Sequence, residues 1–258
     1  MRQFAYSSLP VMPLRSNPDD RSEMVSQVLF GEHFFVNEIY SQWAKITLLN
    51  DNYQGWIDQK AIQKTTNEAL KALKSQPVLM TSKLFTKLSS ETESFYVPMG
   101  SLLPFCDQNR FKLQDKTYTI TDQVAPFTFD VKRFTETCHL FLNVPYLWGG
   151  KTCFGIDCSG LTQIIMGQFG VQLSRDASMQ VNQGSLVAFA AEAQTGDLAF
   201  FENDEGDITH VGIVLTPQTI MHAHGKVRID ALDDMGILNT ETGKHSHRLR
   251  LIKRFFED

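Results

Sequence analysis

The sequence predicts an α+β domain in its second half, preceded by a region of short β-strands. Three observations lead to this prediction. A glycine-rich loop at 149–155 runs into an apolar segment with helical spacing that starts at Cys158. Two β-rich runs, 209–215 and 219–224, follow it with turn residues between them. Residues 10–62 alternate short apolar runs with turn-forming residues, which is typical of a small all-β unit.

The first element of the C-terminal domain is a helix whose opening residue is a cysteine. Gly149, Gly150 and Gly155 let the backbone adopt positive φ and approach another group closely. Asp157 stands where an N-cap belongs, so Cys158 is expected at the first helical position. Unpaired N–H groups and the positive dipole end favour an anion there, which predicts a lowered pKa for the thiol. The apolar stripe of the helix consists of Leu161, Ile164, Ile165 and Phe169.

The second element is an antiparallel hairpin with a histidine on each arm. Its turn falls within 216–218, a Thr-Pro-Gln segment. A turn centred on Thr216 puts His210 directly opposite His222, because each lies six residues from that centre. A turn centred on Pro217 and Gln218 shifts this pairing by about three residues. The register stays open, with side-by-side histidines as the expectation.

A thiol and two histidines match the nucleophile, the base and the orienting group of covalent catalysis. Each residue also has a purely structural interpretation. A cysteine at a helix start is usually packed in the core as an apolar residue, and a histidine in a strand is often a hydrogen-bonded core residue. The joint pattern favours catalysis by Cys158, His210 and His222. His224 competes for the last place, because it lies on the same strand face as His222. The residues without such a context, expected to be structural or surface residues, are His33, His139, His245, His247, Cys106, Cys138 and Cys153.

Composition excludes several classes of function. The 258-residue chain has a net charge of −5, a pI near 5.8 and no cluster of basic residues, so nucleic acid is not an expected partner. The four cysteines have neither disulfide-framework nor zinc spacing, and no metal or cofactor is expected. No membrane is expected as a partner, because no apolar run reaches about 18 residues. The N-terminus lacks the apolar core of a secretory signal, which predicts a cytoplasmic protein, or a periplasmic or cell-envelope protein if a leader has been removed.

Three short motifs mark the N-terminal region: Leu14-Arg15-Ser16, Gly31-Glu32 and Gly55-Trp56-Ile57. Together they resemble a bacterial SH3-like barrel, which we predict over residues 1–63.

The rest of the chain divides into three further segments. A linking helix is predicted over 64–76, because Pro77 ends the helical spacing. The stretch 77–125 is β-rich and is either a degenerate second barrel or an unrelated β region. The surroundings of Gly100 are similar to those of Gly31, but the Gly-Trp signature is missing. The C-terminal domain is predicted over 126–258 and opens with helical spacing at 127–143.

Five motifs of the C-terminal domain resemble one family. They are Tyr146-x-Trp148-Gly149-Gly150, Asp157-Cys158-Ser159-Gly160, Gly196-Asp197-Leu198, His210-Val211-Gly212-Ile213 and His222-Ala223. In this order they resemble the NlpC family of bacterial cell-wall cysteine peptidases, which share a papain-like fold. The resemblance implies an α+β papain-like cysteine peptidase domain preceded by one or two small all-β SH3-like barrels. It also implies that Cys158 is the nucleophile, His210 the general base and acid, and His222 the residue that orients His210.

Barrels followed by such a peptidase resemble the YkfC-like subgroup. The resemblance implies an endopeptidase that cleaves the bond from γ-D-glutamate to a diamino acid in peptidoglycan stem peptides or their recycled fragments. Peptides with a free N-terminal L-Ala would release L-Ala-γ-D-Glu. The implied substrate-binding residues are Asp157, Glu23 and Tyr53 for the ammonium group, and Tyr146, Trp148, Ser159 and Ser178 along the cleft. Two alternatives stay open: a catalytically weak wall-binding module, and an acyltransferase or amidase on another γ-glutamyl or lipid substrate.

Overall fold

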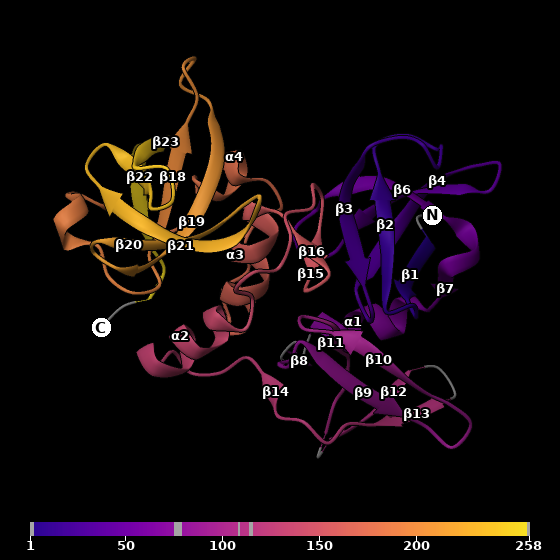
Figure 1. The fold of residues 1–258 in the computed structure, drawn as a ribbon. Coiled ribbons are helices and arrows are strands. Elements are labelled where there is room, and N and C mark those ends of the chain that lie inside the picture. The colour runs from indigo at the N-terminus through magenta and orange to yellow at the C-terminus, as the bar shows by residue number, and fades with distance from the viewer. Residues whose placement is uncertain (1–2, 75–78, 108, 114–115, 257–258) are drawn as a thin grey trace. The chain divides into compact units, whose positions relative to one another are not determined.

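A computed structural model describes residues 3–74, 79–107, 109–113 and 116–256 (Figure 1). The chain divides into two units, Met1–Phe127 and Thr128–Asp258. The finer boundaries after residues 63, 76 and 125 stay predictions. Among the described residues, no helix is long and apolar enough to span a membrane.

The N-terminal unit begins with a seven-stranded antiparallel sheet in the order β3-β2-β6-β5-β4-β1-β7. Apolar residues alternate along its strands and pack on one another, including Leu14, Phe34 and Ile46, each with essentially no exposed surface. The strand pattern expected for this region is therefore confirmed. Its elements are β1 (Gln3–Ser7), β2 (Val11–Arg15), β3 (Met24–Leu29), β4 (His33–Tyr40), β5 (Trp43–Leu48), β6 (Gln54–Asp58), the 3-10 turn η1 (Gln59–Ala61) and β7 (Ile62–Lys64).

A helix and two small sheets complete the N-terminal unit. The helix α1 (Asn67–Lys74) lies within the segment predicted as a linker; the end of that prediction falls on residues 75–78, outside the described part of the chain. The sheets have the orders β10-β9-β13-β12 and β11-β8-β14. Their strands are β8 (Leu79–Thr81), β9 (Phe85–Ser89), β10 (Ser94–Pro98), β11 (Leu102–Leu103), β12 (Arg110–Leu113), β13 (Lys116–Thr119) and β14 (Val124–Ala125).

Phe30 joins the two halves of this unit. Its ring is buried and lies 5.7 Å from the ring of Phe95 and 6.2 Å from that of Phe111, both from the second half. Its carbonyl accepts a 2.8 Å hydrogen bond from the N–H of Leu102. Phe30 therefore belongs to the hydrophobic core of the second half, while the first sheet also has a core of its own.

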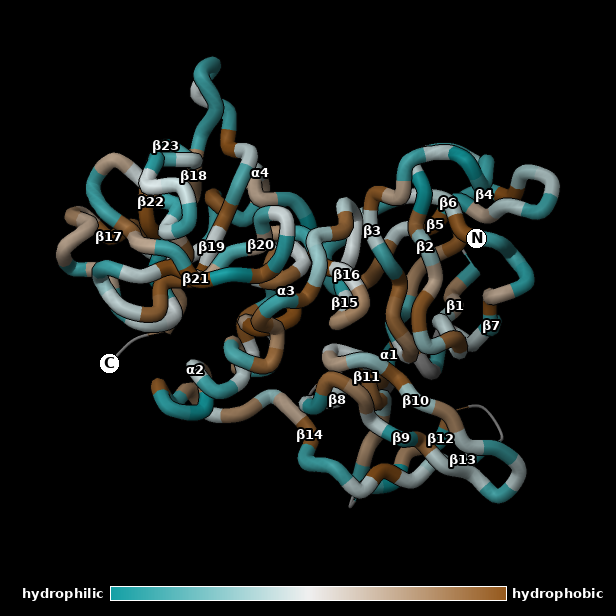
Figure 2. Tube along the Cα trace, viewed as in Figure 1, coloured by the Kyte–Doolittle hydropathy of each residue, from teal (hydrophilic) through white to brown (hydrophobic). Residues whose placement is uncertain are grey.

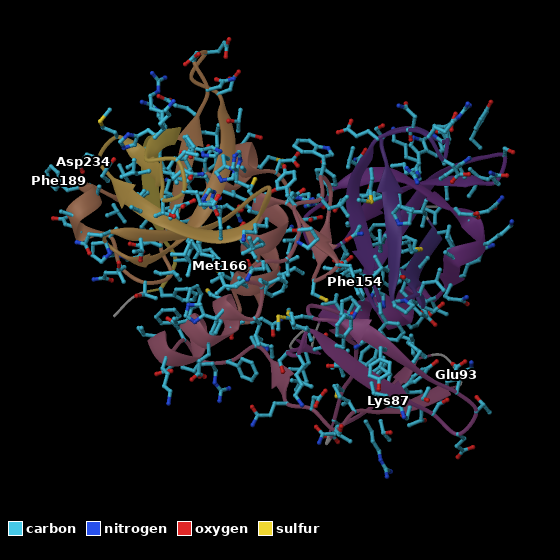
Figure 3. The ribbon with its side chains drawn as sticks, in the orientation of Figure 1. Lys87, Glu93, Phe154, Met166, Phe189 and Asp234 are labelled. Atoms are coloured by element: carbon cyan, nitrogen blue, oxygen red, sulfur yellow. The ribbon has the colours of Figure 1, made fainter. Side chains whose placement is uncertain are left out.

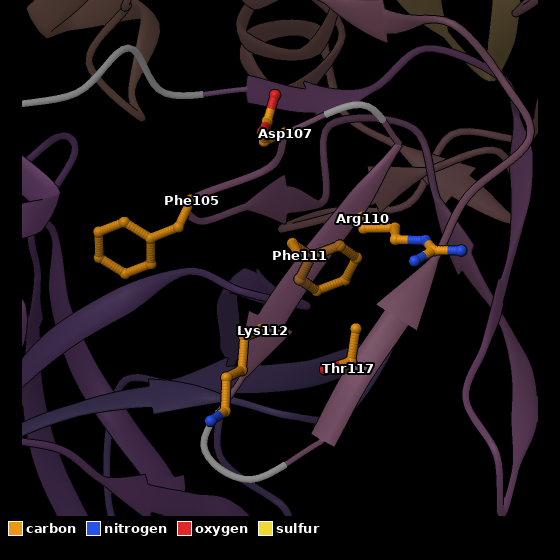
Figure 4. Close-up of a pocket in the computed structure, with 6 residues that line it drawn as sticks. All are labelled: Phe105, Asp107, Arg110, Phe111, Lys112 and Thr117. Carbon is orange, nitrogen blue, oxygen red and sulfur yellow. The ribbon is translucent and has the colours of Figure 1, made fainter.

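A pocket of about 600 Å³ also lies in this unit (Figure 4). Figure 4 shows the charged side chains of Asp107, Arg110 and Lys112 pointing in different directions instead of towards one point. None of the residues that line it was predicted as a site residue. They are Phe105, Asp107, Arg110, Phe111, Lys112 and Thr117.

The C-terminal unit combines helices with a sheet that closes on itself. The sheet order is β17-β23-β18-β19-β20-β21-β22, and β22 also pairs with β23, so that six strands form a barrel-like ring. The helices are α2 (Val131–His139), α3 (Cys158–Gly167) and α4 (Ala177–Gln180), and a short hairpin, β15 (Lys151–Thr152) and β16 (Gly155–Ile156), precedes α3. The other elements are β17 (Ser185–Val187), the 3-10 turn η2 (Ala190–Glu192), β18 (Leu198–Glu202), β19 (Ile208–Thr216), β20 (Thr219–His224), β21 (Lys226–Asp233), β22 (Gly236–Asn239) and β23 (Lys244–Arg254).

Helix α3 packs against β19 and β20, the two strands predicted to carry the histidines. Its residues are mostly apolar, as the brown stretch in Figure 2 shows. Leu161, Ile165 and Met166 are fully buried, and Met166 is labelled in Figure 3. The expected apolar stripe is confirmed, and it fixes the start of α3 over the hairpin.

We predict that Phe30→Ala destabilises the second half of the N-terminal unit and its attachment to β3, because it leaves a cavity in the core that Phe30 forms with second-half residues. The expected loss is about 3–5 kcal/mol of unfolding free energy. Hydrogen exchange should show lower protection in β9 and β13 as well as in β3. Tyr96→Ala, which truncates an exposed aromatic residue on β10, is the matched control and should change little. Unchanged protection of β9 and β13 would contradict the place of Phe30 in the core of the second half.

Candidate active site

Cys158 is the first residue of α3, as the sequence predicts. Asp157 is its N-cap and accepts a 2.7 Å hydrogen bond from the N–H of Gly160. The main-chain N–H groups of Val211 and Ser159 lie close enough to the sulfur of Cys158 to act towards a lower pKa of its thiol. Since Val211 directly follows His210 on β19, the thiol lies against the main chain that carries the first histidine.

The loop before α3 has the close approaches expected of it. Gly149 has φ of +76°, and its N–H donates a 2.8 Å hydrogen bond to Asp157. A side chain on Gly150 would meet the carbonyl of Gly155, and one on Gly155 would meet Leu147. The loop is thus tied to the cap of α3 by its own backbone.

Asp157 is held by a buried arginine that the sequence analysis did not assign to the site. Arg175 is 1% exposed and donates from Nη1 to Oδ1 at 3.0 Å and from Nη2 to Oδ2 at 2.5 Å. Nη1 also donates to Oγ of Ser159 at 2.8 Å. With the N–H groups of Gly149 and Gly160, these donors occupy both carboxylate oxygens. The charge of Asp157 is therefore already paired.

This pairing bears on the role expected for Asp157. An ammonium group approaching it would meet a carboxylate that Arg175 has neutralised. The role as ammonium acceptor stays a prediction, and the geometry gives Asp157 another one, the cap that orients α3 and Cys158.

Burial controls the protonation of the thiol. Cys158 is 7% exposed, and burial, helped by the charge of Asp157, raises the pKa of its thiol to about 11. The two main-chain donors and Arg175 act in the opposite direction without reversing it. The lowered pKa expected from the helix dipole alone is therefore wrong for the free site, because that expectation left out desolvation.

The imidazole of His210 is also neutral in the free site. Burial, followed by the charges of the neighbouring histidines, holds its pKa well below the usual value. Among the described residues, no hydrogen bond joins Sγ of Cys158 to this ring; such contacts in free enzymes often tighten only when substrate binds. In the free site, Cys158 is therefore a neutral thiol and His210 a neutral imidazole.

The two histidines are diagonal neighbours, not directly opposed. His222 pairs with Gly212, and the register then shifts between Val214 and Thr216. The pair Thr216–Thr219 confirms the turn centred on Pro217 and Gln218 and excludes the one centred on Thr216. The irregularity then reduces the expected three-residue shift of the histidine pairing to two residues. Gly212 has no side chain, and a Cβ there would lie 3.1 Å from Cβ of His222 and 2.6 Å from Cδ1 of Ile220. The absence of that atom leaves room for the contact between the imidazoles.

A chain of hydrogen bonds crosses three neighbouring strands. Nε2 of His210 on β19 lies 2.9 Å from Nδ1 of His222 on β20. Nε2 of His222 lies 3.0 Å from Oδ2 of Asp230 on β21. All three side chains are at least 95% buried. The predicted neighbourhood of the two histidines is thus present, and it continues to a carboxylate that the sequence analysis missed.

Asp230 is a well-held anion. Burial raises its pKa, but hydrogen bonds from Arg228, Thr240 and His222 outweigh that effect and hold the pKa well below its usual value. Arg228 donates to both carboxylate oxygens, at 2.6 and 3.0 Å. The available sequence signal was the alternation of Arg228 and Asp230 on one face of a strand next to the hairpin.

His247 on β23 also belongs to this cluster, although it was expected to be structural or at the surface. One nitrogen from each of His210, His222 and His247 lies within 4.8 Å of the other two, a spacing that a metal ion could use. The rings of His210 and His247, however, stack 4.1 Å apart at 24°. Their in-plane lone pairs run nearly parallel instead of converging, and both nitrogens of His222 already have partners. The cluster as it stands does not present a tetrahedral metal site.

The residues predicted to line the cleft differ in exposure. Tyr146 is half-buried, and burial, with the nearby charges of Cys158 and Asp157, raises the pKa of its phenol to about 12. Ser159 is buried under Arg175, whereas Trp148 is 60% exposed and Ser178 is also exposed. Tyr146 and Ser159 are therefore close to the thiol, while Trp148 and Ser178 present surface to solvent.

Glu23 and Tyr53 lie in the N-terminal unit. Glu23 is exposed just before β3, where its carbonyl accepts a hydrogen bond from the N–H of Ser16. Tyr53 precedes β6, is half-buried and packs on the core of the first sheet. Their predicted roles in substrate binding stay predictions.

A first prediction concerns the neutral thiol. We expect the rate of alkylation of Cys158 by iodoacetamide to rise about tenfold per pH unit from neutral pH towards the pKa near 11, because only the thiolate reacts. Peptide mass spectrometry would follow the modification, with Cys158→Ser to show the background from the other cysteines. A rate that is already constant below pH 7 would indicate a preformed thiolate and contradict this prediction.

A second prediction concerns the buried ion pair. Arg175→Met leaves Asp157 without its counter-charge and should lower the unfolding free energy by about 3–5 kcal/mol. The double variant Asp157→Asn with Arg175→Met removes both charges and should be more stable than Arg175→Met alone. Denaturant unfolding measures both, and equal stability of the two variants would contradict the importance of the charge pairing.

Comparison with known proteins is consistent with this geometry. Residues 143–244 match the NlpC/P60 family, and residues 14–62 match the bacterial dipeptidyl-peptidase Sh3 domain. A gamma-D-glutamyl-L-lysine dipeptidyl-peptidase of Bacillus cereus is 25% identical over 86% of this chain and 74% of its own. A probable endopeptidase of Haemophilus influenzae is 31% identical over 51% of this chain and 81% of its own.

A solved structure has the same fold. The crystal structure of an NlpC/P60 family protein from Bacillus cereus superposes with a TM-score of 0.82, covering 97% of this chain and 99% of the other, at 20% identity. The predicted fold class, a papain-like peptidase domain after an SH3-like all-β region, is confirmed. The five motifs lie on one α+β unit, and this chain matches 81% of the length of the Haemophilus influenzae endopeptidase. The chain therefore belongs to the NlpC/P60 family of cysteine peptidases.

Proposed function

We propose that the protein is a cysteine endopeptidase that hydrolyses the bond between the γ-carboxyl of D-glutamate and a diamino acid in peptides derived from peptidoglycan. Family membership accounts for the peptidase activity. The bond is proposed because the Bacillus cereus relative is a gamma-D-glutamyl-L-lysine dipeptidyl-peptidase. The observation that supports catalysis most directly is the position of Cys158 against the main chain that follows His210, with His210 bonded to His222.

The proposed reaction is acyl transfer in two steps. As the substrate binds, Nδ1 of His210 takes the thiol proton of Cys158 and the sulfur attacks the γ-carbonyl carbon. His210 then gives that proton to the amine of the leaving diamino acid, and the C–N bond breaks. Water, deprotonated by His210, hydrolyses the thioester and restores the thiol. Throughout, Nε2 of His210 stays bonded to Nδ1 of His222.

The tetrahedral intermediate requires hydrogen-bond donors for its oxyanion. We propose main-chain N–H groups at the start of α3, where the helix dipole also favours negative charge. Tyr146 is protonated at neutral pH, since its pKa is about 12, so its hydroxyl can donate as well. Loss of one oxyanion donor in sites of this kind costs about 3–4 kcal/mol of transition-state stabilisation.

The proposed substrate is a peptide with a free N-terminal L-Ala, such as a recycled fragment of the wall. Glu23 and Tyr53 of the N-terminal unit would hold its ammonium group, because a desolvated ammonium needs charged or polar acceptors. Asp157 would contribute less than an unpaired carboxylate, because Arg175 already binds both of its oxygens. Trp148 and Ser178 are exposed and would contact the rest of the peptide. A cytoplasmic location, where such fragments are recycled, is part of this proposal.

The test is cleavage of L-Ala-γ-D-Glu-L-Lys and its diaminopimelate analogue, with release of L-Ala-γ-D-Glu followed by mass spectrometry. We expect cleavage by the wild type and none by Cys158→Ala or His210→Ala, because each removes a group that takes part in bond formation or proton transfer. The N-acetylated peptides test the ammonium pocket and should be cleaved at least about tenfold more slowly.

Each outcome has a separate meaning. Equal cleavage of the free and acetylated peptides would overturn the ammonium pocket and leave the peptidase. Cleavage of neither peptide by the wild type would overturn the substrate assignment. Undiminished cleavage by Cys158→Ala would overturn the proposed nucleophile.

A further inference from the structure

We infer that Asp230 is a positioning residue that fixes the tautomers of both histidines and so makes Nδ1 of His210 the basic nitrogen. The inference rests on the proposed function, in which His210 is the base. Asp230 itself contacts neither the thiol of Cys158 nor Nδ1 of His210. Of the two histidines, it hydrogen-bonds only to His222. Its effect passes through the hydrogen-bond chain across β19, β20 and β21.

The direction of each bond follows from the carboxylate end of the chain. An ionised carboxylate can only accept, so Nε2 of His222 must carry the proton in the 3.0 Å contact with Oδ2 of Asp230. In a neutral imidazole the other nitrogen, Nδ1, then has a lone pair and accepts from its partner. That partner is Nε2 of His210 at 2.9 Å, which must therefore carry the proton. The remaining nitrogen, Nδ1 of His210, is left as the acceptor for a thiol proton.

If the donors and acceptors in this series of hydrogen bonds were exchanged, His210 could not act as the base. If Nε2 of His222 accepted instead, its Nδ1 would donate to Nε2 of His210, and the proton of His210 would reside on Nδ1. A protonated Nδ1 cannot take a proton from Cys158. Asp230 selects between the two states because only one of them offers its Oδ2 a donor.

The surroundings of Asp230 hold the carboxylate in place. Arg228 donates from Nε to Oδ2 at 2.6 Å and from Nη2 to Oδ1 at 3.0 Å. Thr240 donates its N–H and its hydroxyl to Oδ1, at 2.9 and 2.8 Å. The side chain of Asp230 has no exposed surface. Three donors thus converge on Oδ1, whereas Oδ2 faces Arg228 Nε and His222.

This asymmetry predicts how an isosteric amide would sit. In Asp230→Asn, the amide oxygen takes the Oδ1 position, because it accepts three hydrogen bonds there and two at the other position. The NH₂ group is then directed at Nε2 of His222, which must accept, and at Nε–H of Arg228, which loses its 2.6 Å acceptor and has to move away. The substitution therefore keeps the size of the side chain and reverses the tautomers of both histidines, while Arg228 keeps its bond to Oδ1 only.

The experiment measures both the kinetics of cleavage and the tautomers of the two histidines. In wild type, ¹⁵N NMR of the imidazoles should show protons on Nε2 of both His210 and His222, whereas Asp230→Asn should show them on Nδ1. With the γ-D-glutamyl peptide, Asp230→Asn should lower kcat by roughly 10²- to 10⁴-fold with little change in KM, since the corresponding substitution in serine proteases costs about 10⁴-fold. Asp233→Asn is the matched control, because Asp233 on the same strand binds only the exposed His245 among the histidines and should leave kcat unchanged.

A double-variant cycle separates positioning from a merely structural role. In a His222→Ala background, Asp230→Asn should cause no further loss of kcat, because its effect passes through His222. An additive loss would overturn the inference, and so would a wild-type His222 with its proton on Nδ1 or an Asp230→Asn variant with wild-type kcat. The NMR measurement on the wild type needs neither a folded variant nor activity. If wild type cleaves no γ-D-glutamyl peptide, the proposed function fails while the tautomers still decide the role of Asp230.

Discussion

The hydrogen bond between Nε2 of His210 and Nδ1 of His222 is the contact on which the rest of the site depends. It joins β19 to β20 inside a barrel-like ring, where neither imidazole can be hydrated in compensation if the bond is lost. Gly212, the residue opposite His222, leaves the space in which the two rings meet. Because each ring must donate or accept in turn, this single contact also decides which nitrogen of His210 faces the thiol.

A second polar network holds the thiol itself. Asp157 caps α3 and is bound by Arg175, so a buried carboxylate beside the nucleophile is neutralised and does not repel the developing thiolate as strongly as it would alone. The apolar stripe of α3 packs on β19 and β20, and the main-chain N–H of Val211 lies near the sulfur of Cys158. The two networks therefore meet at one point through main-chain contact. Both reacting groups are neutral in the free site because burial penalises the charged form of each.

The features that could be predicted from the sequence are those that depend on residues close together along it. The cap at Asp157, the helix start at Cys158 and its apolar stripe each depend on residues within a few positions, and all three are confirmed. The hairpin was also predicted, but its register was not, because an irregularity between Val214 and Thr216 adds a residue that no turn rule reveals.

The partners that act from other elements were not predicted, although Arg228 and Asp230 alternate on a strand next to the hairpin. Arg175, Asp230 and His247 reach the site through tertiary packing, from a loop and from two strands that the local pattern does not orient towards the hairpin. The same limit explains the wrong expectation for the thiol pKa, since a helix dipole is a local feature and desolvation depends on the whole fold. The roles of Glu23 and Tyr53 rest on a resemblance to a family and not on any local pattern.

The most direct test of the account is a crystal structure of Cys158→Ala with an intact L-Ala-γ-D-Glu-L-Lys peptide bound. The account predicts that the γ-carbonyl carbon lies within about 3.5 Å of the position of the missing sulfur. It also predicts that Nδ1 of His210 faces that position while Nε2 remains bonded to His222. A peptide bound with its γ-carbonyl directed elsewhere, or a His210 ring turned away from residue 158, would contradict it.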